Sequence, residues 1–380
     1  MTRTKGVSIC GFYGNYNLGD EAMLAGMINL LKQCQNDLSF TVFSGEPQDS
    51  KLRHSINSVH LNKRKYAFER FIETIRNPIF VLGGGDLLRD SAQSSIALTW
   101  LRPLQQAIRL QRRTLVLGIS VGEISRLETK LAIPKTLNHV DFIAVRDKMS
   151  KAKLEELGVQ KRIHVMSDLA LEAITEQTLI TESTKQNIQI GVSVRHLIGR
   201  GSSLDVSQYS RVLQELAVIL DYLIEKYGAT VHLLPLRTQK ELCHPSDDDY
   251  VSSLELLRYS HHPSKYIVHR YFDSLHEFNQ VVSTLSLMIG MRLHSLILAS
   301  GLGVPIIAAE YDSKVRGFME EIQQSHHSIP LAQFNSERLL PIAERVLQEQ
   351  TAYRAELKQG VDYYRQGLSL MKEHLKEVIC

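Results

Sequence analysis

Three arginines in this sequence follow short apolar runs that resemble buried strands: Arg146, Arg195 and Arg292. An arginine at a strand end can grip a phosphate or a carboxylate through two parallel hydrogen bonds. A single one could equally pair with a neighbouring acid or a helix end. Three in the same position make coincidence the weaker explanation, so the pattern predicts a local site for a small anion.

The segment GMRLHSLILASGLGVPIIAAEYDSKV, residues 290–315, carries the most chemistry. His294 stands two residues after Arg292 at the start of a predicted helix, whose positive end favours a neutral, proton-exchanging imidazole. A capping or core histidine is the plainer alternative. Lys314 follows the next predicted strand and could bring an ammonium to the same place, although a loop lysine is usually only solvated. We interpret Arg292 and His294 as catalytic candidates.

Three consecutive glycines, Gly83, Gly84 and Gly85, follow the apolar run 79–82 and precede Asp86. Glycines permit backbone angles closed to other residues and let a ligand approach the main chain. A tight strand-to-helix turn with Asp86 as the N-cap is the alternative. Because three glycines exceed what a turn needs, we favour a ligand site.

The stretch GFYGNYNLGDEAML, residues 11–24, places Asp20 and Glu21 at the front of a predicted helix. Carboxylates there complement the helix dipole but repel a phosphate, so this loop suits a sugar. Asp20 could be the base that deprotonates a sugar hydroxyl, or it could merely cap its helix. The same loop offers rings that can stack on a sugar and amides that can donate and accept: Tyr13, Tyr16, Asn15 and Asn17.

Apolar runs bounded by turns alternate with helical stretches throughout, which is typical of parallel sheets with crossover helices. A polar stretch at 174–186 predicts a linker. We expect an N-terminal Rossmann-like domain at 1–175, a C-terminal one at 187–345, and a helical tail at 346–380 that can pack back on the first. The predicted fold class is α/β, with two Rossmann-like domains facing a cleft, of the glycosyltransferase-B type.

The predicted strands cover 7–10, 40–43, 79–82, 115–118, 142–145, 164–166, 188–194, 230–234, 266–268, 286–289 and 304–308. The predicted helices cover 22–33, 96–111, 148–157, 205–227, 336–349 and 352–376.

Lysines and arginines (44) nearly balance aspartates and glutamates (41), so no general field exists to hold nucleic acid. The four cysteines lie far apart, and neither a signal-peptide core nor a spanning segment is visible. We expect a cytoplasmic protein whose contact with a membrane is at most peripheral. The histidine pairs at 261–262 and 326–327 lack partners at metal-ligand spacing, so we expect them at the surface and expect no metal site.

Several short motifs stand in order between residues 11 and 314: G-x-Y-G-x-x-N-x-G-D-E, GGG-D, A-x-R-D at 144–147, S-D at 167–168, R-L-H at 292–294 and G-x-P at 303–305. Their order and spacing resemble the polysaccharide pyruvyltransferases. The resemblance implies a glycosyltransferase-B fold and transfer of an enolpyruvyl unit from phosphoenolpyruvate to a sugar of a cell-wall polymer or exopolysaccharide, ending as a pyruvate ketal.

The resemblance also assigns roles. It implies that Arg292 and His294 hold the donor, with Arg146 and Lys314 beside them. We add Arg195 because it also follows a predicted strand. We expect Gly83, Gly84 and Gly85 near the donor, and Asp86 with the N-terminal loop near the acceptor. His294 is the candidate acid for the donor's methylene carbon. No metal is expected if these cations bear the phosphate charge, and no cofactor besides phosphoenolpyruvate as co-substrate. The acceptor side is expected in the domain at 1–175 and the donor side in the domain at 187–345. The enzyme assignment requires that Arg146, Arg292 and His294 gather at an open space and are not each neutralised by an interior acid.

Two alternatives remain. A nucleotide-sugar glycosyltransferase shares the expected fold, but the position where such enzymes often carry a ribose-binding glutamate is Leu298, which accepts no hydrogen bond. A noncatalytic sugar-binding protein would not need cations at three strand ends. The identity of the sugar, its attachment to a lipid and assembly into a homo-oligomer are left open.

Overall fold

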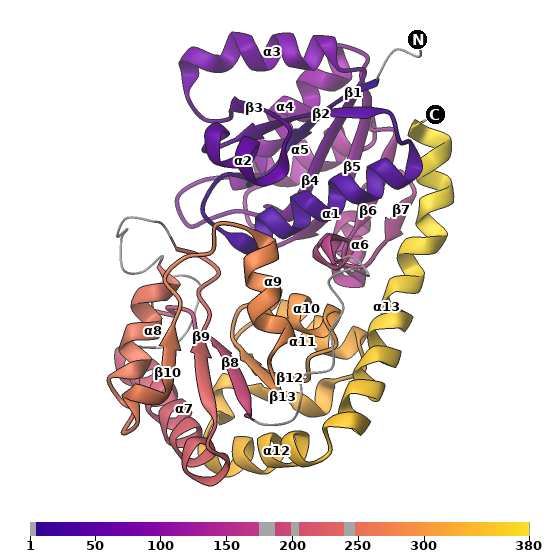
Figure 1. Cartoon of the computed structure of the whole chain (residues 1–380). Helices are drawn as coiled ribbons and strands as arrows, with labels where there is room; N and C mark the ends of the chain where they lie inside the picture. Colours follow the sequence, from indigo (N-terminus) through magenta and orange to yellow (C-terminus); the bar gives the residue numbers. More distant parts are fainter. Residues whose placement is uncertain (1–4, 175–186, 199–204, 239–247, 380) are drawn as a thin grey trace. The chain divides into compact units, whose positions relative to one another are not determined.

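The computed structural model describes residues 5–174, 187–198, 205–238 and 248–379, and the chain divides into two compact units (Figure 1). Unit 1 comprises Met1–Ala173 and Arg365–Cys380, and unit 2 comprises Ile174–Tyr364. The predicted linker at 174–186 lies, except for Ile174, outside the described residues.

The described part of unit 1 contains a seven-stranded parallel sheet in the order β3-β2-β1-β4-β5-β6-β7. Helices cover the sheet, so its strands are apolar and buried. The order reverses direction between β1 and β4. The strands are β1 (Lys5–Cys10), β2 (Leu38–Ser44), β3 (Asn57–His60), β4 (Ile79–Leu88), β5 (Arg113–Val121), β6 (Phe142–Val145) and β7 (Ile163–Val165).

Three of the described helices of unit 1, α1 (Leu18–Cys34), α4 (Ile96–Arg109) and α6 (Lys148–Glu156), begin at a side-chain cap. Asn17, Ser95 and Asp147 each accept a hydrogen bond from the first turn of the helix that follows. Further helices of unit 1 are α2 (Pro47–His54), α3 (Ala67–Arg76) and α5 (Leu127–Leu137), with short 3₁₀ turns η1 (Arg64–Tyr66) and η2 (Leu169–Ala173).

Unit 2 repeats this plan with a six-stranded parallel sheet among its described residues, in the order β10-β9-β8-β11-β12-β13. Its order reverses between β8 and β11. The strands are β8 (Gln189–Ser193), β9 (Thr230–Leu233), β10 (Tyr266–Val268), β11 (Leu287–Gly290), β12 (Ile306–Glu310) and β13 (Ser328–Pro330). The helices are α7 (Val206–Tyr227), α8 (Asp249–Leu257), α9 (Leu275–Ser283), α10 (Leu293–Gly301), α11 (Ser313–Glu321) and α12 (Ser336–Gln348), with 3₁₀ turns η5 (Pro263–Lys265), η6 (Ser325–His327) and η7 (Leu331–Gln333).

The last helix, α13 (Gln350–Ile379), contributes residues to both units. In unit 2, Arg354 donates to the carbonyls of Gly303 and Leu285. In unit 1, Arg365 donates to the Leu171 carbonyl, and the Ile379 carbonyl accepts from Arg113. Its apolar side chains are buried in each part, including Leu357 and Leu375.

The glycine-rich segment differs from its prediction. β4 does not end at Leu82 but continues through the glycines to Leu88, and its register against β5 shifts between Gly85 and Leu88. Asp86 therefore lies within a strand and caps no helix. Gly84 and Gly85 have φ values of 74° and 90°, so the strand passes through backbone angles that residues with a side chain rarely adopt. Glycines do not signal a strand in the sequence, which is why the continuation of β4 was missed.

Strands β3 and β13 were missed because each is a short edge strand. The sequence Asn57–His60 is largely polar, and Ser328–Pro330 ends in a proline that a central strand would exclude. Only one neighbour pairs with each strand, so neither needs the continuous apolar run that marks a buried strand.

His261 and His326 are exposed as expected, but His327 is not at the surface. His327 is 2% exposed, its Nδ1 lies 2.8 Å from Gln324 Oε1, and its ring contacts that of Tyr353. Burial lowers the pKa of His327 to about 4, with smaller contributions from His326 and Arg345. His262 and His326 instead lie beside glutamates, at 2.8 Å from Glu225 and 3.2 Å from Glu356.

This burial predicts an acid-sensitive unit 2. His327 stays neutral when folded, so the unfolded chain takes up the proton first as the pH falls below the ordinary value of 6.5. The free energy of unfolding should therefore fall on acidification between pH 6.5 and about 4, by about 1 kcal/mol once solvent screening is allowed for.

Urea denaturation of His327→Gln across this pH range should show a flatter dependence than the wild-type protein. The exposed His261 provides the control, because His261→Gln should keep the wild-type slope. Equal slopes for wild type and His327→Gln would contradict the assignment.

Candidate active site

Three neighbouring strand ends in unit 2 bring together an arginine, a second arginine and a tyrosine. β11 pairs with β8 on one side and with β12 on the other. Arg195 follows β8, Arg292 follows β11, and Tyr311 follows β12. These strand ends flank the point where the strand order reverses, which is where open α/β sheets bind their ligands.

Arg195 and Tyr311 are in direct contact. Arg195 Nη1 donates to the Tyr311 hydroxyl at 2.5 Å, and the guanidinium carbon lies 4.9 Å from the centre of the ring. Burial raises the pKa of Tyr311, while the charges of Arg195 and Arg292 act in the opposite direction and Asp312 adds to the rise. The sequence prediction included Arg195 but missed Tyr311, although its position directly after a strand was a visible signal.

Arg292 is held by a buried carboxylate. Its Nε lies 2.9 Å from Asp249 Oδ2 and 3.1 Å from Oδ1, and Nη2 also donates to Oδ1. Asp249 is 1% exposed and accepts two further hydrogen bonds, from the backbone nitrogens of Leu236 and Arg237. The expectation that no interior acid neutralises Arg292 is therefore wrong. The carboxylate fixes the direction of the guanidinium but cancels much of its charge.

His294 and Lys314 lie in the first turns of two helices at the same edge of the unit 2 sheet. His294 is half-buried in α10, whose N-cap position is Arg292. Lys314 is half-buried in α11, where its backbone nitrogen donates to Asp312 Oδ1 at 3.0 Å. Both helix starts present their positive ends at this edge.

The glycines of β4 in unit 1 accommodate Tyr13. The Tyr13 hydroxyl donates to the Gly83 carbonyl at 2.5 Å, and a side-chain carbon added at Gly84, whose φ is +74°, would lie 2.6 Å from the Tyr13 hydroxyl oxygen. Tyr13 is fully buried, so the prediction that its ring stacks on a sugar is wrong. Burial, with the charges of Asp20 and Glu21, raises the pKa of its hydroxyl.

Glu21 fixes the N-terminal loop. Its Oε1 accepts from the backbone nitrogen of Gly14 at 2.8 Å, and its Oε2 lies 2.7 Å from His54 Nε2. Asn17 Oδ1 accepts from Gly19, which makes Asn17 the N-cap of α1, and Asn15 Nδ2 donates to the Tyr13 carbonyl. These contacts hold the loop in shape, and His54 is a participant that the sequence did not reveal.

Asp20 does not cap α1, because Asn17 does. Asp20 is 7% exposed, and a side-chain carbon added at Gly85 would lie 3.3 Å from Asp20 Oδ1. The carboxylate therefore lies against the glycine backbone at the end of β4. Tyr16 is half-buried with a left-handed φ of 53°, and the Asp86 carboxylate lies 3.6 Å from Arg89.

Arg146 follows β6 in unit 1 and forms an ion pair with a buried acid. Its Nη1 donates to Asp168 Oδ2 at 3.1 Å, and Asp168 is 1% exposed. The expectation that Arg146 faces no interior acid is therefore wrong. The S-D motif at 167–168 supplies this partner, so two predicted motifs of unit 1 converge on one ion pair.

Among the described residues, no group of three or more histidine, cysteine, aspartate or glutamate side chains is arranged to hold a metal ion. Within the same ranges, no helix is both long and apolar enough to cross a bilayer.

Comparison with solved structures shows the fold. The chain is similar to UDP-GlcNAc 2-epimerase from Methanocaldococcus jannaschii (TM-score 0.60, 13% identity, 91% of this chain and 93% of that chain). It is also similar to UDP-GlcNAc 2-epimerase from Neisseria meningitidis bound to UDP-GlcNAc (0.60, 10%, 99% and 99%) and to a glycosyltransferase from Rickettsia africae (0.59, 11%, 99% and 99%). The predicted α/β fold of the glycosyltransferase-B type with a C-terminal helix is confirmed, and at such low identities nothing beyond the fold follows.

The sequence model of a family described as polysaccharide pyruvyl transferase matches residues 17–313. The match includes Asp20, the three glycines, Arg146, Arg195, Arg292 and His294, whereas Tyr13, Asn15 and Tyr16 precede it and Lys314 follows it. Since most of the chain is matched, this protein belongs to the polysaccharide pyruvyl transferase family.

Proposed function

We propose that this protein transfers the enolpyruvyl group of phosphoenolpyruvate to a sugar of a polysaccharide or of its lipid-linked precursor, and closes it into a pyruvate ketal. The observation that carries the proposal is the grouping of Arg195, Arg292 and Tyr311 at neighbouring strand ends of unit 2. Phosphoenolpyruvate bears a phosphate and a carboxylate on three carbons, and two separate guanidinium groups match these two anions.

In this proposal, unit 2 binds the donor. Asp249 neutralises part of the Arg292 charge, so Arg292 acts mainly as an oriented hydrogen-bond donor. Arg195 and Lys314 supply the remaining positive charge, and the start of α10 adds its dipole. Tyr311 keeps Arg195 in place through its hydroxyl and its ring. Arg146, already paired with Asp168, is a weaker candidate for donor binding than it is from the sequence alone.

The chemistry then assigns His294 as the acid. The protonated imidazole of His294 gives its proton to the methylene carbon of the donor, and a sugar hydroxyl, which loses its proton to the acceptor base, attacks the cationic carbon that results. Phosphate leaves from the tetrahedral adduct with the electrons of its C–O bond. A second hydroxyl bonds to the same carbon and gives its proton to His294, which closes the ketal and restores the acid. The sequence needs no cofactor, because the donor, the sugar and these side chains supply every atom and proton.

The acceptor is assigned to unit 1. Asp20 is the proposed base for the attacking hydroxyl, with Tyr16, Asn15 and Asp86 as further contacts to the sugar. The loop that carries these side chains is held by three hydrogen bonds, between Tyr13 and Gly83, Glu21 and Gly14, and Asn17 and Gly19. The glycines of β4 would serve by admitting Tyr13 and letting Asp20 lie close to the chain.

A nucleotide-sugar glycosyltransferase is the second candidate, because two of the solved structures of similar fold are UDP-GlcNAc 2-epimerases. The position expected for a ribose-binding glutamate is occupied by Leu298, which is fully buried in α10 and has no side-chain oxygen. This favours the smaller phosphorylated donor. A noncatalytic sugar-binding protein would not need arginines at neighbouring strand ends together with His294 at a helix start.

Mass spectrometry of sugar acceptors separates these candidates. After incubation with phosphoenolpyruvate we expect products carrying one added pyruvate in ketal linkage, with release of phosphate. Incubation with nucleotide sugars should leave the acceptor unchanged. An added hexose, or no change with either donor across a panel of cell-wall and exopolysaccharide acceptors, would count against the proposal.

Replacing Arg195 with glutamine should weaken donor binding. We expect kcat/KM for phosphoenolpyruvate to fall roughly tenfold to a hundredfold, the range for a lost charge-assisted hydrogen bond, while KM for the sugar stays near its wild-type value. Steady-state kinetics with each substrate varied in turn measure both. Arg211→Gln, at an exposed position on α7 of the same unit, is the matched control. An equal loss in the control, or an effect confined to the sugar KM, would refute the role of Arg195.

Replacing Asp20 with asparagine keeps the shape of the side chain and removes its basicity. If Asp20 is the acceptor base, kcat should fall by about a hundredfold or more with little change in the melting temperature. Glu21→Gln should behave differently, with a lowered melting temperature, because Glu21 holds Gly14 and His54. Wild-type kcat in Asp20→Asn would restrict Asp20 to a structural role.

A further inference from the structure

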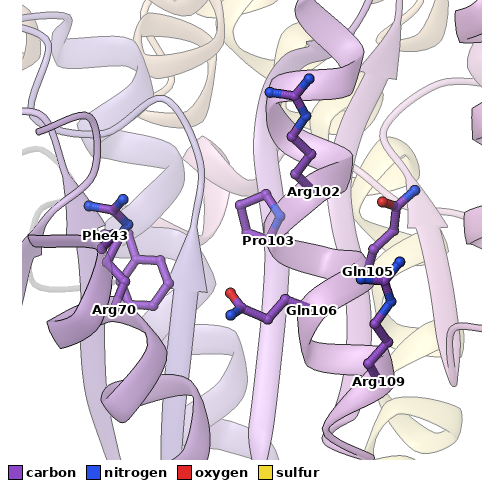
Figure 2. Close-up of a pocket in the computed structure, with 8 residues that line it drawn as sticks. Phe43, Arg70, Arg102, Pro103, Gln105, Gln106 and Arg109 are labelled. Atoms are coloured by element: carbon purple, nitrogen blue, oxygen red, sulfur yellow. The ribbon is translucent and has the colours of Figure 1, made fainter. Parts of the chain in front are cut away.

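Unit 1 contains a pocket that none of the assigned roles uses. It lies between α3 and α4 and has a volume of about 390 Å³, within the range of small-ligand sites (Figure 2). Figure 2 shows Phe43 and Arg70 on one side and the α4 side chains on the other. The residues that line it are Phe43, Ala67, Arg70, Arg102, Pro103, Gln105, Gln106 and Arg109.

This pocket shares no lining residue with the groups assigned to the acceptor. Helix α4 contributes residues from its second half, up to its last residue, Arg109. On the other side, Phe43 lies near the carboxyl end of β2, and Arg70 in the first turn of α3 donates to the carbonyl of His60 at the end of β3. Asp20 and the glycines of β4 are not among the lining residues.

The lining of the pocket is positively charged and contains no acid. Three arginines from two helices face it, and in the described chain none of the three forms an ion pair. Arg70 Nη1 donates only to neutral carbonyls, at 2.6 Å to His60 and 3.3 Å to Lys63. Burial lowers the pKa of Arg70, with Cys10 and Glu69 acting in the opposite direction. Positive side chains on several sides of one pocket favour the entry of an anion.

His60, whose carbonyl accepts the hydrogen bond from Arg70, also lies near positive charges. His60 is 9% exposed, and within the described ranges neither ring nitrogen has a hydrogen-bond partner. Its pKa is lowered by burial and by the charges of Lys63, Arg70 and Lys65, against an opposing effect of Glu46. The charges that act on His60 are mainly positive, and the pocket beside it is lined by three arginines and no acid, in a chain whose charges nearly balance overall.

We propose that this pocket is a second anion site, which binds a phosphate-bearing group through Arg70, Arg102 and Arg109. Paired guanidinium donors fit phosphate oxygens, and the amides of Gln105 and Gln106 stand beside them. Phe43, Ala67 and Pro103 supply an apolar wall that suits a substituent on the phosphate. A free diphosphate and the head group of an anionic lipid share this chemistry.

Calorimetric titration with inorganic pyrophosphate tests the soluble form of the ligand. Arg102→Gln and Arg109→Gln are the informative variants, because both side chains are exposed and their loss should leave the fold intact. Each should weaken binding at this site about tenfold, an effect that grows at low salt. Arg162→Gln, at an exposed position elsewhere in unit 1, should bind as the wild type does. Arg195→Gln removes pyrophosphate binding at the proposed donor site of unit 2. The binding that remains in this variant should equal the wild-type binding at the pocket of unit 1.

Sedimentation with phosphatidylcholine vesicles, with and without phosphatidylglycerol, tests the lipid form with the same variants. Binding that requires phosphatidylglycerol and falls in Arg102→Gln and Arg109→Gln, but not in Arg162→Gln, would support a head-group site. Pyrophosphate binding with the same dependence would support a soluble ligand. If the pocket variants match Arg162→Gln in both experiments, or if wild type binds neither probe, the proposal is overturned.

Discussion

Each unit depends on the parallel arrangement of its strands, which brings every strand end with a functional side chain to one edge of a sheet. The order reverses between β1 and β4 in unit 1 and between β8 and β11 in unit 2. Loops leave in opposite directions at such a point, so the side chains between them lack the cover of a crossover. In unit 2, this edge collects Arg195, Arg292 and Tyr311, although 116 residues separate Arg195 from Tyr311 in sequence.

A second constraint is that buried charges need partners. Arg146 and Arg292, two of the strand-end arginines, each lie against an aspartate that is 1% exposed. Leaving either guanidinium unpaired inside the fold would cost several kcal/mol, about the size of the whole stability of many domains. The pairs therefore make the arginines compatible with folding and hold them in one direction. The partner of Arg195 is a tyrosine and not an acid: its guanidinium donates to the Tyr311 hydroxyl and lies over the Tyr311 ring.

The sequence was a good guide to the central strands of both sheets, although β4 and β5 continue to Leu88 and Val121, past their predicted ends. Strands buried on both faces carry unbroken apolar runs, so all the central strands of both sheets could be found, and the edge strands β3 and β13 could not. The three arginines predicted to follow strands, Arg146, Arg195 and Arg292, do so in the structure. Their partners were not predicted, because Asp249 pairs with Arg292 across 43 residues and no local pattern records such a contact.

The three glycines of β4 were recognised as unusual, but the sequence did not show that they accommodate Tyr13. Glycines beside a predicted strand favoured a ligand, yet their backbone is needed first by Tyr13, whose hydroxyl reaches Gly83 across 70 residues. Likewise, Glu21 was recognised as unusual for its place at a helix start, while its bond to His54 depended on a helix 33 residues away. Tertiary packing decided both roles.

The long final helix has a consequence for how the molecule unfolds. Leu357 and Val361 of α13 are buried in unit 2, and Leu368, Met371 and Leu375 of the same helix are buried in unit 1. A continuous helix loses its hydrogen bonds cooperatively, so melting in one half weakens the neighbouring turns. Removing this single C-terminal element would strip apolar cover from two hydrophobic cores at once, which makes the end of the chain a shared determinant of cooperativity.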